Sequence, residues 1–174
     1  MKYQLSHKQI NSIYTNTIAF MESKENLSLE TAIFIGNWLG SDSSQKGKSY
    51  YDVWDLVLKN YMPSTRPVLY RSCNRRENGR IASFTSSIRC ANKFSDGKGF
   101  LLICDTNETL CCLHLERQGD YSHTFFPLVE LLRKEAQSPN CRFSKQLLEN
   151  YIKEDEYIMR VNTDWMYSCK WYNG

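Results

Sequence analysis

The apolar positions of the first 62 residues repeat with the spacing of an α-helix. They fall into three groups: Ile10, Ile13, Tyr14, Ile18 and Met21; Ala32, Ile33, Ile35 and Leu39; and Tyr50, Val53, Trp54, Val57, Leu58 and Tyr61. Residues three or four apart share one face of a helix, so the pattern predicts three amphipathic helices. Ser28 suits the N-cap of the second helix and Gly40 its end. Residues 41–48 form a polar loop, and Pro63 ends the third helix.

After Pro67 the pattern changes to short apolar runs, which are typical of strands. We predict strands over residues 68–71, 81–85, 100–104, 109–115, 157–161 and 165–172. Further helices are expected from Ser86 or Ser87 through Phe94, and over residues 128–135 and 145–152. The outline is an α+β protein: a helical N-terminal subdomain (residues 1–62) and a strand-rich body (residues 63–174) that forms one compact unit.

Composition and charge narrow the class of protein. The 174 residues are 41% hydrophobic and 24% charged, which excludes a disordered chain. The sequence contains no apolar run of about 18 residues, so we expect no membrane-spanning helix. The first eight residues have no apolar core, so we expect no signal peptide. Net charge is only +3, yet residues 66–93 hold seven cations and one acid. This concentration indicates an anionic ligand nearby.

The seven cysteines are odd in number and irregularly spaced, and none forms a C-x-x-C motif. We interpret them as free, mostly buried thiols of a reducing compartment. Cys111, Cys112 and His114 are candidate zinc ligands, but their spacing fits no standard zinc site. We therefore expect no metal.

Three short segments carry side chains that suit catalysis. The first is Leu69-Tyr70-Arg71, the second is the hydroxyl cluster Ser83-Phe84-Thr85-Ser86-Ser87, and the third is Glu154-Asp155-Glu156. An arginine holds phosphate with a bidentate fork. Alternate residues of a strand point to one face, so we expect both glutamates to enter one cleft and Asp155 to point away. A solvated acidic turn is the alternative interpretation of the third segment.

The order of these segments resembles the Arg–Ser–Glu class of mono-ADP-ribosyltransferases, in which an arginine, a Ser/Thr-rich motif and an E-x-E motif lie on three core strands. Over residues 67–162 the chain is similar to the small Mod-type enzymes of T-even phages. The stretch Ala91–Phe94 also matches the segment that follows their second motif. The sequence departs from their pattern at two positions. Ser72 stands where they tend to have glycine, and Arg160 stands where a proline often follows the E-x-E strand.

The resemblance implies a fold, a reaction and a setting. The fold would be the split β-sheet core of an ADP-ribosyltransferase. The protein would transfer ADP-ribose from NAD⁺, its substrate, to a protein and release nicotinamide. E-x-E rather than Q-x-E implies an arginine acceptor. The acceptor would be a protein of a host or target cell, and the enzyme would act in that cell's cytoplasm.

The resemblance also assigns roles to single residues. Glu156 would stabilise the oxocarbenium-like transition state, Glu154 would serve as general base for the acceptor, and Thr85 would hold Glu156. The residues expected to bind NAD⁺ are Arg71, Tyr70, Ser86, Ser87, Phe94 and Arg89. Arg71 would clamp the pyrophosphate with help from Arg89, and Phe94 would face the cationic nicotinamide. Alternatively, Ser86 or Ser87 caps a helix, and Phe94 is a core residue.

Two other classes of function are consistent with the same residues. In a non-catalytic module, a basic patch would bind nucleic acid through Arg71, Arg75, Arg76, Arg80 and Arg89. The absence of aromatic residues between these arginines disfavours that interpretation. Alternatively, the fold serves as an inhibitor or adaptor that binds a partner protein. NAD⁺ hydrolysis without transfer is a further possibility. The first 62 residues would either recognise the target or cover the NAD⁺ cleft.

Overall fold

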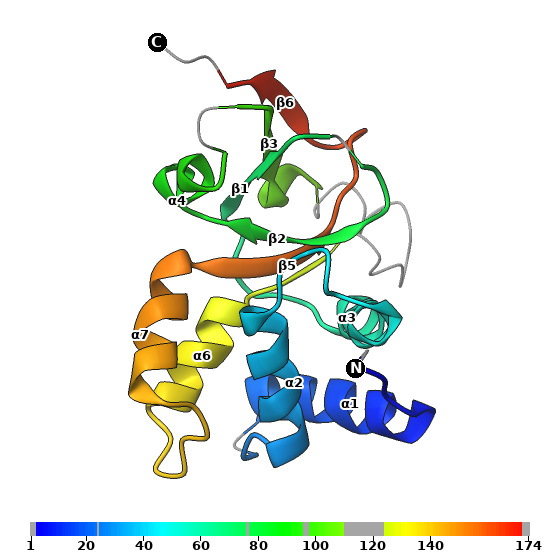
Figure 1. Ribbon diagram of the computed structural model, residues 1–174, viewed down its shortest axis with the longest axis vertical. Coiled ribbons are helices and arrows are strands. Elements are labelled where there is room, and N and C mark those ends of the chain that lie inside the picture. Colours follow the sequence, from blue (N-terminus) through cyan, green and yellow to red (C-terminus); the bar gives the residue numbers. More distant parts are fainter. Residues whose placement is uncertain (1–2, 24, 76, 96–97, 110–123, 172–174) are drawn as a thin grey trace.

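An antiparallel sheet forms the centre of the computed structural model, which describes residues 3–23, 25–75, 77–95, 98–109 and 124–171. Six strands of this part of the chain lie in the order β4-β5-β2-β1-β3-β6 (Figure 1). Their bounds are β1 Val68–Cys73, β2 Ile81–Thr85, β3 Phe100–Asp105, β4 Phe125–Phe126, β5 Glu156–Arg160 and β6 Tyr167–Lys170. The α+β class is therefore confirmed.

Helices flank the sheet on both sides (Figure 1). Their bounds are α1 His7–Glu22, α2 Leu29–Gly40, α3 Lys48–Asn60, α4 Ile88–Lys93, α6 Leu128–Ala136 and α7 Lys145–Glu154. Serine N-caps begin several of them: Ser6 forms a capping box with Gln9, Ser28 caps α2, and Ser144 caps α7. The three helices expected in the first 62 residues are confirmed.

The predicted strands need three corrections. Residue 109 is helical rather than extended, and residues 110–115 lie outside the described part of the chain. The last strand is shorter than expected, because β6 covers only Tyr167–Lys170. The two-residue strand β4 was not predicted, since Phe125 and Phe126 precede Pro127 in a run too short for any periodicity.

The sheet is nearly divided between β1 and β2. These strands are joined by one residue pair, Tyr70 with Thr85. In contrast, β1 and β3 share six pairs, and β2 and β5 share five. The expected split core is thus a single hydrogen-bonded sheet in this structure. It consists of two three-stranded halves, β4-β5-β2 and β1-β3-β6, that diverge beyond that one pair.

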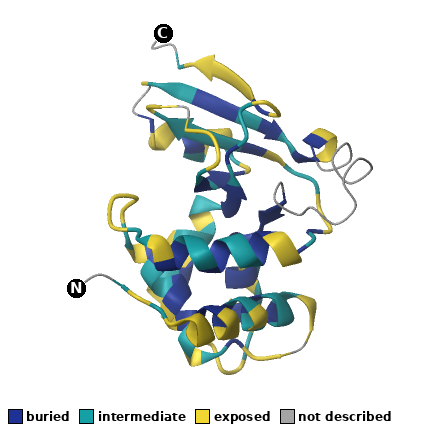
Figure 2. Ribbon diagram, turned by 90° about the vertical axis from the view of Figure 1, so that its right-hand side faces the viewer, coloured by how far each residue is buried: buried dark blue, intermediate teal, exposed yellow. Residues whose placement is uncertain are grey.

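Two hydrophobic cores fill the two sides of the sheet. One joins α1, α2 and α3 to α6 and α7, and its largest side chains include Trp38, Trp54 and Phe126. The other contains Phe84 and Met159 together with β1 and β3 side chains. The alternation of strand side chains explains this division, since neighbouring residues face opposite sides. Figure 2 shows the buried inner surfaces of these helices and strands.

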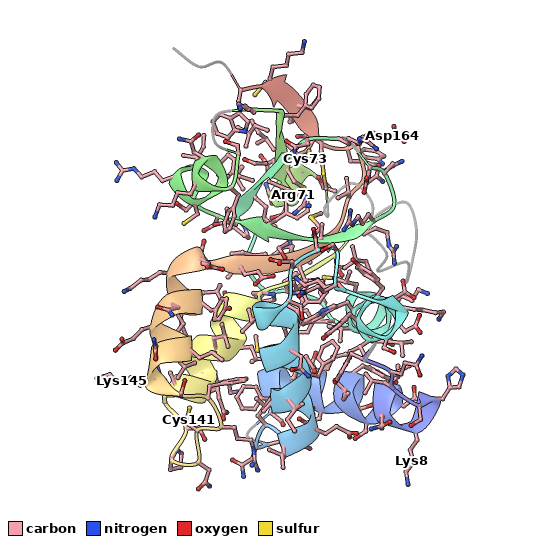
Figure 3. The ribbon with its side chains drawn as sticks, viewed as in Figure 1. Lys8, Arg71, Cys73, Cys141, Lys145 and Asp164 are labelled. Atoms are coloured by element: carbon pink, nitrogen blue, oxygen red, sulfur yellow. The ribbon has the colours of Figure 1, made fainter. Side chains whose placement is uncertain are left out.

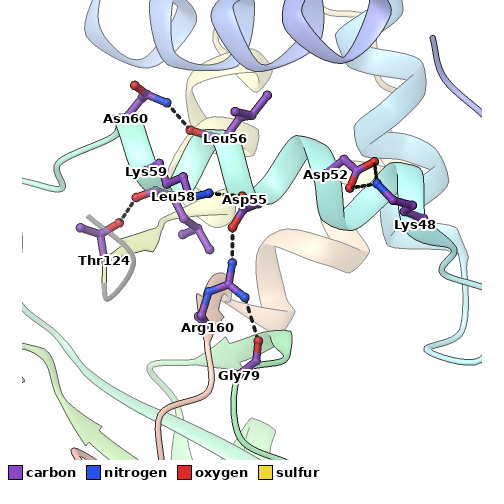
Figure 4. Close-up of polar contacts among 10 residues, drawn as sticks. All are labelled: Lys48, Asp52, Asp55, Leu56, Leu58, Lys59, Asn60, Gly79, Thr124 and Arg160. Carbon is purple, nitrogen blue, oxygen red and sulfur yellow. Dashed lines mark hydrogen bonds and ion pairs between the residues drawn. The ribbon is translucent and has the colours of Figure 1, made fainter. Parts of the chain in front are cut away.

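Polar contacts attach α3 to the sheet (Figure 4). Arg160 of β5 forms an ion pair with Asp55 of α3, and its Nη1 donates to the Gly79 carbonyl at 2.8 Å. Lys59 also pairs with Asp55, at 2.6 Å. The Thr124 hydroxyl donates to the Leu58 carbonyl at 2.7 Å. The departure at Arg160 therefore has a structural role, because it connects α3, β5 and the turn before β2.

The cysteines of the described part of the chain form no disulfide bond, as expected, but the expectation that most are buried is wrong. Of these five cysteines, only Cys104 is buried, whereas Cys73 and Cys90 are half-buried and Cys141 and Cys169 are exposed. Burial raises the pKa of the Cys104 thiol to about 11, so this group is a thiol at neutral pH.

Alanine substitutions at Gly99 and Gly36 test this fold, because we expect them to change the free energy of unfolding in opposite directions. Gly99 has φ +80°, and a Cβ there would lie 2.5 Å from the Cys73 carbonyl oxygen, whereas a Cβ at Gly36 inside α2 meets nothing within 4 Å. We expect Gly99→Ala to lower the free energy of unfolding by more than about 1 kcal/mol. Gly36→Ala should raise it by about 0.5–1 kcal/mol. Urea denaturation measures both, and an unchanged stability of Gly99→Ala would contradict the described loop.

Candidate active site

The cleft of interest opens where β1 and β2 diverge. It has a volume of about 450 Å³, a size typical of ligand sites. Its lining comes from β1, β2, α4, the C-terminal end of α2, the loop that follows α2, and the junction of α7 with β5. A second hollow of about 420 Å³ shares Ser43, Arg71, Ser72 and Phe94 with the cleft. The two together form one elongated site.

The E-x-E segment is a helix–turn–strand junction rather than a loop that enters a strand. Glu154 is the last residue of α7, Asp155 has left-handed backbone angles (φ 53°, ψ 51°), and Glu156 begins β5. Asp155 accepts hydrogen bonds from the Ser86 amide, at 3.0 Å, and from the Ser86 hydroxyl. Aspartate tolerates the left-handed region better than most residues. The left-handed turn, and not strand alternation, brings both glutamates to one cleft, whose lining does not include Asp155.

Glu156 is buried and held by two donors. Its side chain is 8% exposed, and its Oε1 accepts from Trp38 Nε1 at 2.9 Å and from Ser83 Oγ at 2.5 Å. A buried carboxylate needs such donors to offset the loss of water. The pair fixes the position of the carboxylate at the bottom of the cleft.

The structure corrects the role expected of Thr85. Thr85 lies opposite Glu156 in the β2–β5 register, but its hydroxyl accepts from the Ser87 amide at 3.1 Å. Ser83 holds the carboxylate instead. Ser83 and Thr85 share one face of β2, so the sequence pattern alone did not distinguish between them.

Arg71 stands at the point of divergence and lines both hollows. Its Nη1 donates to the Ser83 carbonyl at 2.8 Å, so the guanidinium bridges β1 and β2 beyond their one residue pair. Figure 3 shows Arg71 in the middle of the molecule, beside β2. Burial lowers the pKa of Arg71, yet a guanidinium remains charged at neutral pH. A guanidinium has five N–H groups, so this bond leaves capacity for an anion.

Cations gather in the second hollow. Arg71, Arg75 and Arg80 line it together with Glu77, which pairs with Arg80 at 2.7 Å. Arg76 lies outside the described residues. Three arginines against one acid leave this end of the site positive, whereas Glu154 and Glu156 make the other end negative.

The residues expected to bind NAD⁺ divide into two groups. Arg71, Tyr70 and Phe94 line the cleft, whereas its lining does not include Ser86, Ser87 or Arg89. Phe94 is 67% exposed at the C-cap of α4, so it is not a core residue.

The other three have structural or surface positions. Ser87 is the N-cap of α4 and accepts from the Cys90 amide, as the alternative interpretation held. Ser86 bonds Asp155 and so fixes the turn between the two glutamates. Arg89 is exposed on α4.

Sequence reasoning missed several residues that line the cleft. Besides Ser83, these are Trp38, Lys46 and Tyr151. Lys46 Nζ lies 3.7 Å from the centre of the Trp38 ring. Burial lowers the pKa of Lys46, and the charge of Glu156 partly opposes this shift. The helical spacing places Trp38 among core residues, and Lys46 lies in a polar loop, so no pattern pointed to either.

Ser72, which stands where the similar phage enzymes tend to have glycine, links β1 to its surroundings. Its hydroxyl donates to the Ala91 carbonyl of α4 at 2.5 Å and accepts from Trp171 Nε1 at 3.1 Å. A glycine at this position would lack both bonds. Ser72 therefore helps to hold α4, and with it Phe94, beside the cleft.

The surroundings of Glu154 raise the pKa of its carboxyl group. Burial, and next the charge of Glu156, raise the pKa of Glu154, whereas Lys46 lowers it. A carboxylate whose pKa is raised accepts a proton more readily near neutral pH. The two carboxylates thus differ in their surroundings: Glu156 is fixed by two donors, and the carboxyl group of Glu154 has a raised pKa.

Comparisons with protein-family models, with curated proteins and with solved structures find no match to this chain. Within the described ranges, no group of three His, Cys, Asp or Glu side chains is placed to hold a metal ion. Cys111, Cys112 and His114 lie outside those ranges. In the same part of the chain, no helix combines the length and apolar character needed to cross a bilayer.

The pKa of Glu154 provides a test of this geometry. We expect Glu156→Gln to lower that pKa, because it removes a nearby negative charge, and Lys46→Ala to raise it, because it removes a nearby positive charge. Carbon-detected NMR titration of the glutamate carboxyl groups measures both shifts. Shifts of the same sign in the two variants would show that the three groups do not share one cleft.

Proposed function

We propose that this protein is an NAD⁺-dependent mono-ADP-ribosyltransferase that modifies arginine side chains of a protein. Two carboxylates and a guanidinium, from two segments far apart in the sequence, converge on one cleft, and this convergence carries the proposal. The sequence resemblance adds the expectation that the acceptor is a protein in the cytoplasm of a host or target cell.

The charge distribution of the elongated site suits NAD⁺. The dinucleotide has a cationic nicotinamide at one end and an anionic pyrophosphate in its middle. The carboxylate end holds Glu154 and Glu156, and the arginine end holds Arg71, Arg75 and Arg80. Phe94 lines both hollows and is exposed, so its ring is accessible to the cationic nicotinamide. A nucleic-acid module receives less support, because the two carboxylates would repel a phosphate backbone.

The proposed reaction exchanges one bond at the anomeric carbon of the nicotinamide ribose. The bond from that carbon to the nicotinamide nitrogen breaks, and its electron pair leaves with nicotinamide. Glu156, held in place by Trp38 and Ser83, stabilises the developing positive charge. A nitrogen of the acceptor guanidine forms the new bond. Glu154 takes the proton that this nitrogen loses and passes it to solvent.

Glutamate-to-glutamine variants test the proposed catalysis. We expect Glu156→Gln to slow nicotinamide release by about 10²–10³-fold or more, because it removes the charge but keeps an oxygen for Trp38 and Ser83. Glu154→Gln should abolish transfer while it retains nicotinamide release. The assay incubates the protein with labelled NAD⁺ and a bacterial lysate. Glu149→Gln, an exposed position on the same helix, is the matched control. Equal label on lysate proteins from the native protein and Glu156→Gln would contradict the assignment.

Arginine variants test the proposed anion end. Arg71→Lys keeps the charge but loses the bidentate fork, so we expect the KM for NAD⁺ to rise about tenfold or more. Arg89→Lys, on the exposed surface of α4, should leave the KM within about twofold. Thermal melting of both variants separates binding from stability, because Arg71 also bonds the Ser83 carbonyl. An equal effect of the two substitutions would show that Arg71 has no special place in the site.

A further inference from the structure

A cation already occupies one aromatic face of the cleft. Lys46, in the loop between α2 and α3, places its ammonium 3.7 Å from the centre of the Trp38 ring. The face of an indole ring attracts cations more strongly than that of any other side chain. Trp38 is only 1% exposed, so a ligand reaches this face after Lys46 moves away.

The two carboxylates complete a site for a positive charge. Trp38 Nε1 donates to Glu156, so the ring that carries the ammonium is fixed against that carboxylate. The charges of Glu156 and Lys46 attract each other, and Lys46 also acts on Glu154. At the same time, burial of the ammonium disfavours its charged form. Lys46 is therefore held by the site at a cost in hydration, which makes it displaceable.

The aromatic residues that line the cleft include Phe94, which comes from the other side of the sheet. Phe94 ends α4, and Trp38 lies near the end of α2; Figure 1 shows these helices on opposite sides of β2. In the proposed function, Phe94 contacts the nicotinamide, which is the leaving group. The acceptor must then lie beside Glu154, its base, where both Trp38 and Tyr151 line the cleft, and Trp38 is the ring that already carries a cation.

We propose that the Trp38 face, flanked by Glu154 and Glu156, is the subsite for the acceptor guanidinium, and that Lys46 fills it until the acceptor displaces it. A guanidinium is flat and weakly hydrated, stacks on aromatic rings and pairs with carboxylates through two parallel bonds. It therefore competes well with a compact, strongly hydrated ammonium. That this cation belongs to an acceptor rests on the proposed function; the cation site itself does not.

The inference gives the N-terminal helices a part in substrate recognition. Trp38 comes from α2, and the loop with Lys46 connects α2 to α3. The catalytic glutamates come from the other end of the chain. The acceptor subsite is thus shared between the helical subdomain and the strand-rich body.

The test uses agmatine, a small molecule with the guanidinium of arginine, and requires no NAD⁺. Agmatine is titrated into nitrogen-labelled protein while the indole N–H signals are followed by NMR, with the Trp38 signal assigned through Trp38→Phe. We expect agmatine to shift the Trp38 signal, and Lys46→Ala to tighten agmatine binding by about threefold to thirtyfold, because the tethered competitor is gone. Lys48→Ala, which removes an exposed lysine of the same region, is the control and should leave the affinity unchanged.

Three outcomes would overturn the subsite: no shift of the Trp38 signal, equal affinities in the native protein and Lys46→Ala, or a shift of that signal by 1-methylnicotinamide but not by agmatine. The last result would indicate that Trp38 binds the nicotinamide leaving group instead of the acceptor. Nicotinamide release from NAD⁺ is measured separately on the same samples. Agmatine binding at Trp38 in a protein without turnover would preserve the cation site and refute the proposed activity. Turnover without agmatine binding at Trp38 would preserve the activity and refute the subsite.

Discussion

The divergence of β1 from β2 is the constraint on which the rest of the site depends. Only Tyr70 and Thr85 pair across this junction, so backbone groups beyond them need other partners. Arg71 meets this need by donating to the Ser83 carbonyl, and a charged side chain therefore lies inside the sheet. The cleft and the position of the Arg71 guanidinium both follow from this opening.

Glu156 couples the two ends of the chain. Its carboxylate, buried at the start of β5, is held by Trp38, 118 residues earlier, and by Ser83 of β2. Loss of either donor would leave a buried charge with one partner, which is costly. The N-terminal helices are therefore part of the candidate site as well as of the main hydrophobic core, which they share with α6 and α7.

The sequence predicted those features that depend on local periodicity. The amphipathic helices and the strands β1, β2, β3 and β5 follow from spacing and residue type, whereas the expectation that Arg71 shares one cleft with Glu154 and Glu156 rested on the resemblance. Contacts between distant segments were not accessible in this way: nothing near Trp38 indicates its bond to Glu156. Glu156 accepts a hydrogen bond from Ser83 and not from Thr85, and this difference depends on the geometry of two side chains on the same face of β2. The helical position of Glu154 depends on the left-handed turn at Asp155, which breaks the alternation assumed for that segment.

A crystal structure of the Glu156→Gln variant grown with NAD⁺ tests the central claim most directly, because it shows where each part of the dinucleotide lies. The account predicts the nicotinamide ribose beside the side chain of residue 156, the nicotinamide against Phe94 and the pyrophosphate on Arg71. NAD⁺ bound elsewhere, or a cleft that stays without it at saturating concentration, would contradict the assignment of this site.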